Sequence, residues 1–209
     1  MVANTCAICN GSDTKLCSSC HSISYCSEEC QKTDWPLHKT ICKGLTALLP
    51  RPSPSHKLAI LFPVDSKKPK IIWVNCEHQT DDEYGIQVEW ERADIHSILE
   101  TKNVDPHYRT PIPEYKPITR NVLRGINLNH TVAVFCRDTF LIDGSIPNIC
   151  VRQTTRGKMT HNWCGPIVVL RQPGTDLSDL RFYEDITAAD LRVVVDYFLS
   201  YGCGSIFNR

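Results

Sequence analysis

The sequence has no excess of charge of either sign. Lysine and arginine together number 23, aspartate and glutamate also number 23, and the formal net charge at pH 7 is zero. Binding to nucleic acid or to an anionic membrane surface relies on a positive field, which this composition does not provide. We therefore expect neither nucleic acid nor a membrane to be a partner of this chain.

Long apolar segments are missing as well. No run approaches the roughly 18 residues that a membrane-spanning helix needs. The N-terminal sequence, Met-Val-Ala-Asn-Thr-Cys, lacks the charged start and the apolar core of a signal peptide. We expect an intracellular protein, located in the nucleus, the cytoplasm or both. In such a reducing compartment the 12 cysteines are not expected to form structural disulfides, so metal binding is the better interpretation of them.

The cysteines are unevenly distributed, and their distribution divides the chain. Seven lie at or before position 42, and the other five are isolated. Between the two groups, residues 50–55 contain three prolines, which cannot continue a helix and which favour an extended linker. We predict a metal-binding module with a C-terminal helix at residues 1–49, a linker at residues 50–55 and a second domain at residues 56–209.

The second domain has the pattern of a mixed α+β fold. Short apolar runs rich in β-branched residues predict buried strands, and alternation of apolar with polar residues predicts a half-buried strand. Four prolines make residues 105–117 a predicted loop. The predicted strands lie at residues 58–64, 71–74, 86–90, 131–135 and 166–170.

The last segment has the clearest helical signal. Thr187 and Asp190 have the spacing of a capping box, and Gly202 is a suitable residue for the end of the helix. We predict a long amphipathic helix that ends the domain, with its apolar stripe in the core. The apolar residues that recur at helical spacing are Leu191, Val194, Val195, Phe198 and Leu199.

The strongest signal is a set of eight metal-ligand residues near the N-terminus. Structural zinc takes four tetrahedral sulfur or imidazole ligands, so eight ligands predict two closed sites with no position left for water or substrate. Each Cys-x2-Cys pair forms a tight turn that directs two thiolates at one ion, and each later pair, spaced four residues apart, shares one face of a helix. The eight residues are Cys6, Cys9, Cys17, Cys20, Cys26, Cys30, His38 and Cys42.

Two further features of this region carry predictions. Asp34 is expected to cap a helix that has Pro36 in its first turn and that continues to the predicted linker. His21, next to Cys20, is a possible ninth ligand, but the set of eight is complete without it. We therefore expect His21 to lie at the surface.

The segment from Tyr25 to Lys39, Tyr-Cys-Ser-Glu-Glu-Cys-Gln-Lys-Thr-Asp-Trp-Pro-Leu-His-Lys, resembles the MYND zinc-finger family. The resemblance covers residues 6–42, includes all eight ligands and implies a small, cross-braced finger with two structural zinc ions. The spacing alone does not give the pairing of the ligands. The pairing that the family implies is Cys6, Cys9, Cys26 and Cys30 on one ion, and Cys17, Cys20, His38 and Cys42 on the other.

The resemblance also implies a partner. Fingers of this family bind short proline-rich peptides, often of the Pro-x-Leu-x-Pro type, which lie extended beside a short strand. The matching positions are Trp35 for packing on the peptide, Gln31 for a hydrogen bond to its backbone, Ser18 on the same groove and the aromatic Tyr25. Trp35 and Tyr25 could instead be core residues of the finger. We expect an adaptor or regulatory scaffold, such as a transcriptional co-regulator, rather than an enzyme.

Two enzyme functions remain as alternatives. MYND fingers also occur in SET-domain lysine methyltransferases, but there SET sequence precedes the finger, whereas five residues precede Cys6 here. Residues 56–209 resemble no known family, and an unrecognised active site in them is the main alternative. His161 and Cys164 would be its first candidates, although nothing in the sequence marks this thiol as reactive.

Overall fold

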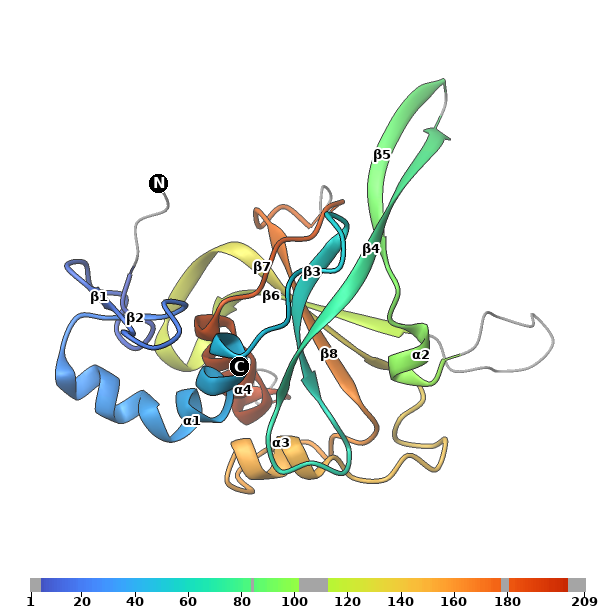
Figure 1. Ribbon diagram of the computed structural model, residues 1–209. Helices are drawn as coiled ribbons and strands as arrows, with labels where there is room; N and C mark the ends of the chain where they lie inside the picture. The colour runs from blue at the N-terminus through green and yellow to red at the C-terminus, as the bar shows by residue number, and fades with distance from the viewer. Residues whose placement is uncertain (1–4, 84, 102–112, 178–180, 203–209) are drawn as a thin grey trace, which may run out of the picture.

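The computed structural model describes residues 5–83, 85–101, 113–177 and 181–202. Figure 1 shows a small N-terminal part with one long helix and a larger part built on a sheet. Within the described ranges, no helix is long and apolar enough to cross a membrane. The elements in chain order are β1 (Lys15–Leu16), β2 (Ser24–Tyr25), α1 (Glu28–Thr46), β3 (His56–Phe62), β4 (Lys70–Glu83), β5 (Ile86–Ala93), α2 (His96–Leu99), β6 (Pro113–Asn121), η1 (Val122–Arg124), β7 (Ile126–Arg137), α3 (Ile149–Thr154), β8 (Ile167–Pro173) and α4 (Ala188–Ser200).

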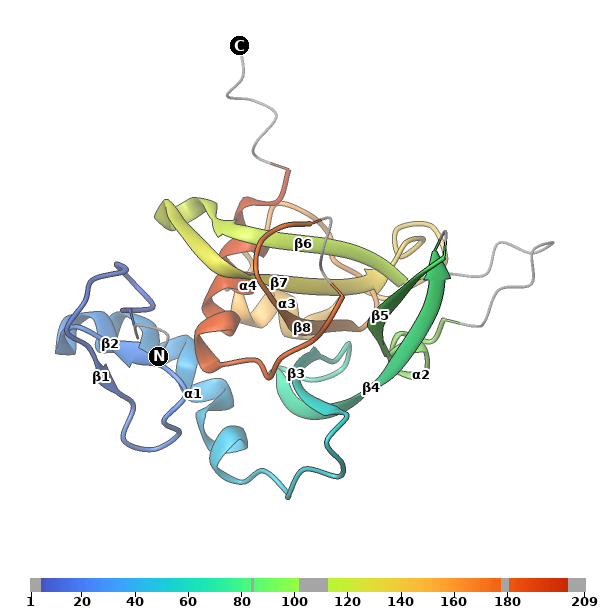
Figure 2. The same ribbon diagram turned by 90° about the horizontal axis from the view of Figure 1, so that it is seen from above.

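The larger part is a six-stranded sheet with the order β5-β4-β3-β8-β7-β6. Every pair of neighbouring strands is antiparallel. The sheet curves like half of a barrel, and the outer half of the β4–β5 hairpin projects away from it (Figure 1, Figure 2). The five predicted strands are present as β3, β4, β5, β7 and β8. The predicted α+β class therefore holds in a coarser form, that of an antiparallel sheet with short helices.

The loop predicted at residues 105–117 is wrong for residues 113–117, which belong to β6. The rest of that loop, residues 105–112, lies outside the described residues. Pro113 and Pro117 both take part in the ladder with β7. Proline has no N–H to donate, but β6 is the last strand of the sheet and one of its edges needs no partner strand. The prolines are tolerated because of this edge position.

Apolar side chains on both faces of the sheet are buried. Successive residues of a strand point to opposite faces, so each of the central strands contributes to two clusters. One face packs against α4, and the other packs against α2 and Tyr183. Ile60, Val132 and Val169 lie on the first face, and Ala59, Ala133 and Val168 lie on the second.

Helix α4 confirms the prediction for the C-terminal segment. The backbone N–H of Thr187 donates to Oδ2 of Asp190 at 2.7 Å, and both halves of the capping box are present. Leu191 and Phe198 are completely buried. Gly202 has a φ of 80°, a left-handed conformation that glycine adopts without strain just after a helix.

Helix α1 begins earlier than the sequence predicts. The hydroxyl of Ser27 accepts a hydrogen bond from the backbone N–H of Cys30 at 3.2 Å, so Ser27 and not Asp34 is the N-cap. The helix continues through Pro36, whose missing N–H leaves the carbonyl of Lys32 without a helical partner. Lys32 is exposed, so water can satisfy this carbonyl. Asp34 is 1% exposed, and its carboxylate makes tertiary contacts instead.

The N-terminal part packs directly on the sheet part. Tyr25 and Ile41 belong to the same buried cluster as Leu191 of α4. In the predicted linker, Arg51 forms an ion pair with Asp185 at 2.5 Å. The domain boundary at residues 50–55 stays a prediction, but apolar and ionic contacts join the two sides of it.

Candidate functional site

Two tight turns near the N-terminus have the same backbone geometry. In the turn that starts at Cys6, the N–H of Asn10 donates to the carbonyl of Cys6 at 2.9 Å. In the turn that starts at Cys17, the N–H of His21 donates to the carbonyl of Cys17 at 3.0 Å. Asn10 and His21 both have left-handed backbone, with φ values of 60° and 51°. His21 is exposed and belongs to neither ligand cluster described below.

The eight predicted ligands meet in two clusters, and the chain alternates between them. Within each cluster the ligand atoms lie within 4.8 Å of one another. The first pair and the third pair share one cluster, and the second and fourth pairs share the other, which confirms the cross-braced pairing. The clusters are Cys6, Cys9, Cys26 and Cys30, and Cys17, Cys20, His38 and Cys42.

The distances within both clusters fit a tetrahedral zinc ion. With Zn–S bonds of about 2.3 Å, two sulfur ligands of a tetrahedral site lie about 3.8 Å apart. Sγ of Cys26 lies 3.4 Å from Sγ of Cys9 and 3.7 Å from Sγ of Cys30. In the other cluster, Sγ of Cys20 lies 3.2 Å from Nε2 of His38. Four protein ligands at each site are consistent with two structural zinc ions and leave no open position for a substrate.

The thiols of the first cluster have very different pKa values. Burial raises the pKa of Cys6, but backbone hydrogen bonds, the largest of them with Cys26, outweigh it and lower the pKa to about 6. Side-chain hydrogen bonds, first with Cys9, raise the pKa of Cys26 to about 12. One thiolate therefore forms readily, and a metal ion bound in the cluster would stabilise the ionised form of the other thiols. Outside the finger, burial raises the pKa of Cys150 to about 12, as is typical of a structural thiol.

A hydrogen-bonded chain leads from the second cluster into the larger part. With Nε2 of His38 facing the metal, Nδ1 is free to carry the proton and to donate to the hydroxyl of Tyr25, 3.2 Å away. The Tyr25 hydroxyl donates to Oδ2 of Asp34 at 2.6 Å. Oδ1 of Asp34 accepts from Nε of Arg192, on α4, at 2.7 Å. The zinc ligand is thus held in orientation by a residue 154 positions away, since 192 minus 38 is 154.

The chain of contacts continues along α4 and returns to the finger. Nη1 of Arg192 lies 3.5 Å from Oδ1 of Asp196. Oδ2 of Asp196 accepts from Nε of Arg124 at 2.5 Å. Nη1 of Arg124 donates to the carbonyl of Ile8, between the first two ligands of the other cluster, at 3.2 Å. With Asp34, the network contains two carboxylates and two guanidinium groups, so its buried charges balance.

A comparison with known families matches residues 6–42 to the MYND finger. The match ends at the last predicted ligand, Cys42, and includes all members of both clusters. Residues 6–42 are a MYND zinc finger. The predicted resemblance is thereby confirmed for the finger, and the family model covers no residue beyond it.

Several known proteins are similar to part of the chain. The SET domain and MYND-type zinc finger protein 6 of Schizosaccharomyces pombe is 34% identical over 99 residues, which are 45% of this chain and 20% of that protein. The zinc finger MYND domain-containing protein 10 homolog of Drosophila melanogaster is 46% identical over 39 residues, 19% of this chain and 9% of that protein. The ubiquitin carboxyl-terminal hydrolase 19 of Arabidopsis thaliana is 49% identical over 47 residues, 21% of this chain and 7% of that protein. The chain thus spans a fifth or less of these relatives, and no solved structure matches it.

Two of the predicted peptide contacts, Tyr25 and Gln31, line a groove beside β1. Lys15 and Leu16 of that strand form the other side of the groove. Gln31 is exposed, whereas Tyr25 is 4% exposed and its hydroxyl is engaged by Asp34. Leu16 is 46% exposed and lines the groove, but it is not among the peptide contacts predicted from the sequence. Its position directly before the ligand Cys17 could have indicated this role.

The other two predicted contacts, Trp35 and Ser18, are not among the residues that line this groove. Trp35 lies about one turn after Gln31 on α1, and its indole is 45% exposed. The indole meets the ring of His38 edge-on, with the ring centroids 5.6 Å apart. Ser18 is exposed in the second cysteine turn, two positions after Leu16.

The candidates for an active site in the larger part are not brought together. His161 packs edge-on against Trp163 and Phe140 in an aromatic cluster. The thiol of Cys164 donates to the carbonyl of Asn162 at 3.5 Å, and burial raises its pKa. No hydrogen bond between His161 and Cys164 is found in the described part of the chain.

Proposed function

We propose that the MYND finger docks proline-rich peptides of the Pro-x-Leu-x-Pro type on partner proteins, and that the chain acts as an adaptor or regulatory scaffold. The observation that carries this proposal is the combination of two closed zinc sites with an exposed apolar surface beside a strand. Both metal shells are complete, so the metals have a structural role and the finger acts through its surface. The varied relatives, which share the finger but carry different names, agree with a general interaction module.

The proposed binding mode is the addition of a strand. In the described residues β1 pairs with β2 alone, so its outer edge can accept an extended peptide. Leu16 and Trp35 would pack on the leucine and prolines of the peptide, and Gln31 would bond to its backbone. A proline-rich peptide is already extended when free, so it loses little conformational entropy on binding.

The test is calorimetric titration of the full chain with a synthetic Pro-x-Leu-x-Pro peptide. Trp35→Ala should abolish measurable binding, because a buried aromatic anchor commonly contributes about 2 kcal/mol or more. Gln31→Ala should weaken binding less, by roughly 0.5–1.5 kcal/mol for one hydrogen bond. Zinc content is measured on the same samples, and Leu49→Ala, an apolar residue that is 78% exposed and outside the finger, is the control.

Two results would contradict the proposal. If the wild type binds no such peptide, the finger has a different ligand or only a structural role. If Trp35→Ala binds as well as the wild type while Leu49→Ala is also unchanged, the groove has been assigned to the wrong surface.

An enzyme is the second candidate, and one observation favours it. The similarity to the SET domain and MYND-type zinc finger protein extends over 99 residues, well beyond the finger. The similarity covers a fifth of that protein. In the described part of the chain, His161 packs against aromatic rings and the Cys164 thiol donates to a backbone carbonyl, so this pair does not support an active site. Equilibrium dialysis with S-adenosylmethionine distinguishes the candidates, since a methyltransferase would bind it and an adaptor would not.

A further inference from the structure

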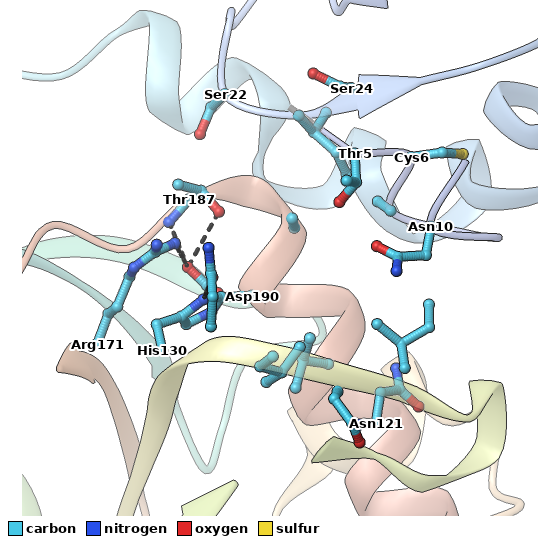
Figure 3. Close-up of a pocket in the computed structure, with 18 of the residues that line it drawn as sticks. Thr5, Cys6, Asn10, Ser22, Ser24, Asn121, His130, Arg171, Thr187 and Asp190 are labelled. Carbon is cyan, nitrogen blue, oxygen red and sulfur yellow. Dashed lines mark hydrogen bonds and ion pairs between the residues drawn. The ribbon is translucent and has the colours of Figure 1, made fainter. Parts of the chain in front are cut away.

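Two pockets lie where the finger meets the larger part, and their charges differ. The first has a volume of about 570 Å³ and contains the side chains of His130, Arg171 and Asp190 (Figure 3). Nε2 of His130 lies 2.9 Å from Oδ1 of Asp190, and Nη1 of Arg171 lies 3.6 Å from Oδ2. The charges of Arg171 and Asp190 balance, so this pocket does not attract an ion of either sign.

The second pocket is smaller and has an excess of positive charge. Its volume is about 310 Å³, at the lower end of the range of ligand-binding pockets. It is lined by α1, by α4, by the loop between β3 and β4, and by the end of α3 with the turn that follows. None of its lining residues is an aspartate or a glutamate, and four are cationic: Lys67, Arg156, Lys158 and Arg192. In a chain whose net charge is zero, this local excess favours an anion as the ligand.

Three of the four cations have no partner of opposite charge. Arg192 is neutralised, because it pairs with Asp34 and Asp196. In the ranges that the structure describes, no ion pair or side-chain hydrogen bond involves the other three. All three are exposed at the rim of the pocket. Their charges are therefore available to a ligand that enters from the solvent.

A tight turn after α3 fixes the positions of two of these cations. The N–H of Arg156 donates to the carbonyl of Gln153 at 3.2 Å, and the N–H of Gly157 donates to the carbonyl of Arg152 at 2.7 Å. These bonds occupy carbonyl oxygens at the end of the helix that would otherwise repel an anion. Arg156 and Lys158 are thereby held on one side of the pocket, while Lys67 approaches from the loop between β3 and β4.

The available donors suit a phosphate monoester better than a carboxylate. A phosphate monoester carries a charge of about −1.5 to −2 at pH 7 and three acceptor oxygens, so it can pair with several cations at once. The guanidinium of Arg156 can donate to two of these oxygens, and the lysines supply point charges. No aromatic residue lines the pocket, so a nucleotide base would have no ring on which to stack. The apolar wall, to which Leu37 and Leu199 contribute, can pack against the carbon atoms that carry the phosphate.

We propose that this pocket binds the phosphate monoester group of a ligand, with Lys67, Arg156 and Lys158 as its charge partners. Two sources present this group in the same way: a phosphoserine or phosphothreonine of a partner protein, and a small phosphorylated metabolite without a base. The pocket shares no lining residue with the groove beside β1, so this inference is independent of the function proposed for the groove.

The test is a titration of the full chain, with zinc bound, followed through its backbone amide signals by NMR. The probes are inorganic phosphate, glycerol phosphate and the peptide Ala-Ala-phosphothreonine-Ala-Ala, and acetate at the same ionic strength is the comparison anion. The amides of Gly157 and Lys158 should shift with each phosphate-bearing probe. These probes should bind at least about tenfold more tightly than acetate, because a dianion pairs with several of the cations. The tighter of the two organic probes identifies the source of the group.

Substitutions matched in charge and position show whether the pocket is the site. Arg156→Gln and Lys67→Gln should each weaken the binding of inorganic phosphate about fivefold, because each removes a charged donor. The controls are Arg152→Gln, on α3, and Lys68→Gln, beside Lys67, neither of which lines the pocket. All four positions are exposed, so folding should be preserved. Both controls should keep the wild-type affinity within about twofold.

Three results would overturn the proposal. In the first, the wild type binds none of the phosphate-bearing probes more tightly than acetate. In the second, inorganic phosphate binds but neither organic probe does, which indicates an adventitious ion only. In the third, Arg152→Gln and Lys68→Gln weaken binding as much as Arg156→Gln and Lys67→Gln, which indicates attraction to the general surface charge. A chain that fails to bind the proline-rich peptide but passes these tests would overturn only the function proposed for the groove.

Discussion

The two zinc clusters have similar ligands but very different surroundings. In the first cluster, Cys6 is buried, but Cys9 and Cys26 are exposed. In the second, His38 is 1% exposed and Cys42 is 3% exposed, and both belong to the buried interior. The second cluster is linked to α4 through Tyr25, Asp34 and Arg192. The first cluster is linked to α4 through Arg124, which contacts Asp196 and the carbonyl of Ile8. The first site therefore stabilises mainly turns at the surface, whereas the second site lies at the junction of the finger with the larger part.

The largest expected effect comes from removing one ligand of each cluster. His38→Ala should lose its zinc ion and also disturb the core of the larger part. Structural zinc contributes on the order of 10 kcal/mol, which is comparable to the whole stability of a domain. Cys26→Ala should lose the other zinc ion and disorder the finger surface, with the sheet intact. Zinc analysis measures the metal content, and near-UV circular dichroism measures the packing of the aromatic residues, of which Trp163 is buried in the larger part. An equal loss of the near-UV signal in the two variants would refute the distinction.

Removing the finger tests whether the larger part folds without it. Residues 56–209 expressed alone should still melt cooperatively, because the sheet has apolar clusters on both faces. The melting temperature should be lower than in the full chain, because the part of the core that Ile41 shares with α4 is exposed. Differential scanning calorimetry checks this. If no cooperative melt is seen, the predicted boundary at residues 50–55 is wrong and the chain has one indivisible core.

Breaking the link between the second cluster and α4 should have a smaller but clear effect. Arg192→Met leaves Asp34, 1% exposed, without its cationic partner, and such a loss typically costs 3–5 kcal/mol in the free energy of unfolding, as an order of magnitude. Urea denaturation measures this change, and zinc content should remain at two ions because all eight ligands are retained.

The smallest expected effect serves as the control for this network. Lys32 and Glu28 lie 2.7 Å apart on α1, but both side chains are at least 74% exposed. Lys32→Met should therefore change the stability by less than about 0.5 kcal/mol. If Arg192→Met and Lys32→Met have the same small effect, the buried network does not join the two parts.

The sequence predicts the metal ligands and α4 well, because both depend on residues that are close together along the chain. The cysteine spacing and the cap at Thr187 are local patterns of this kind. It does not predict β6, because Pro113 and Pro117 are compatible with a strand only at the edge of a sheet, and edge position is a property of the whole fold.

The role of Asp34 shows the same limit. Its position before Pro36 has the local pattern of a helix cap, but Ser27 caps the helix and Asp34 pairs with Arg192. The two residues are 158 positions apart, and only the packing of α1 against α4 brings them together.

The most direct test of the whole account is a stepwise removal of zinc from the intact chain. The chain should contain two zinc ions, and a chelator should withdraw them in two phases. The first phase should leave the near-UV circular dichroism signal largely unchanged, and the second should diminish it. A zinc content near one, or a single phase in which both ions leave without any change in that signal, would contradict the account.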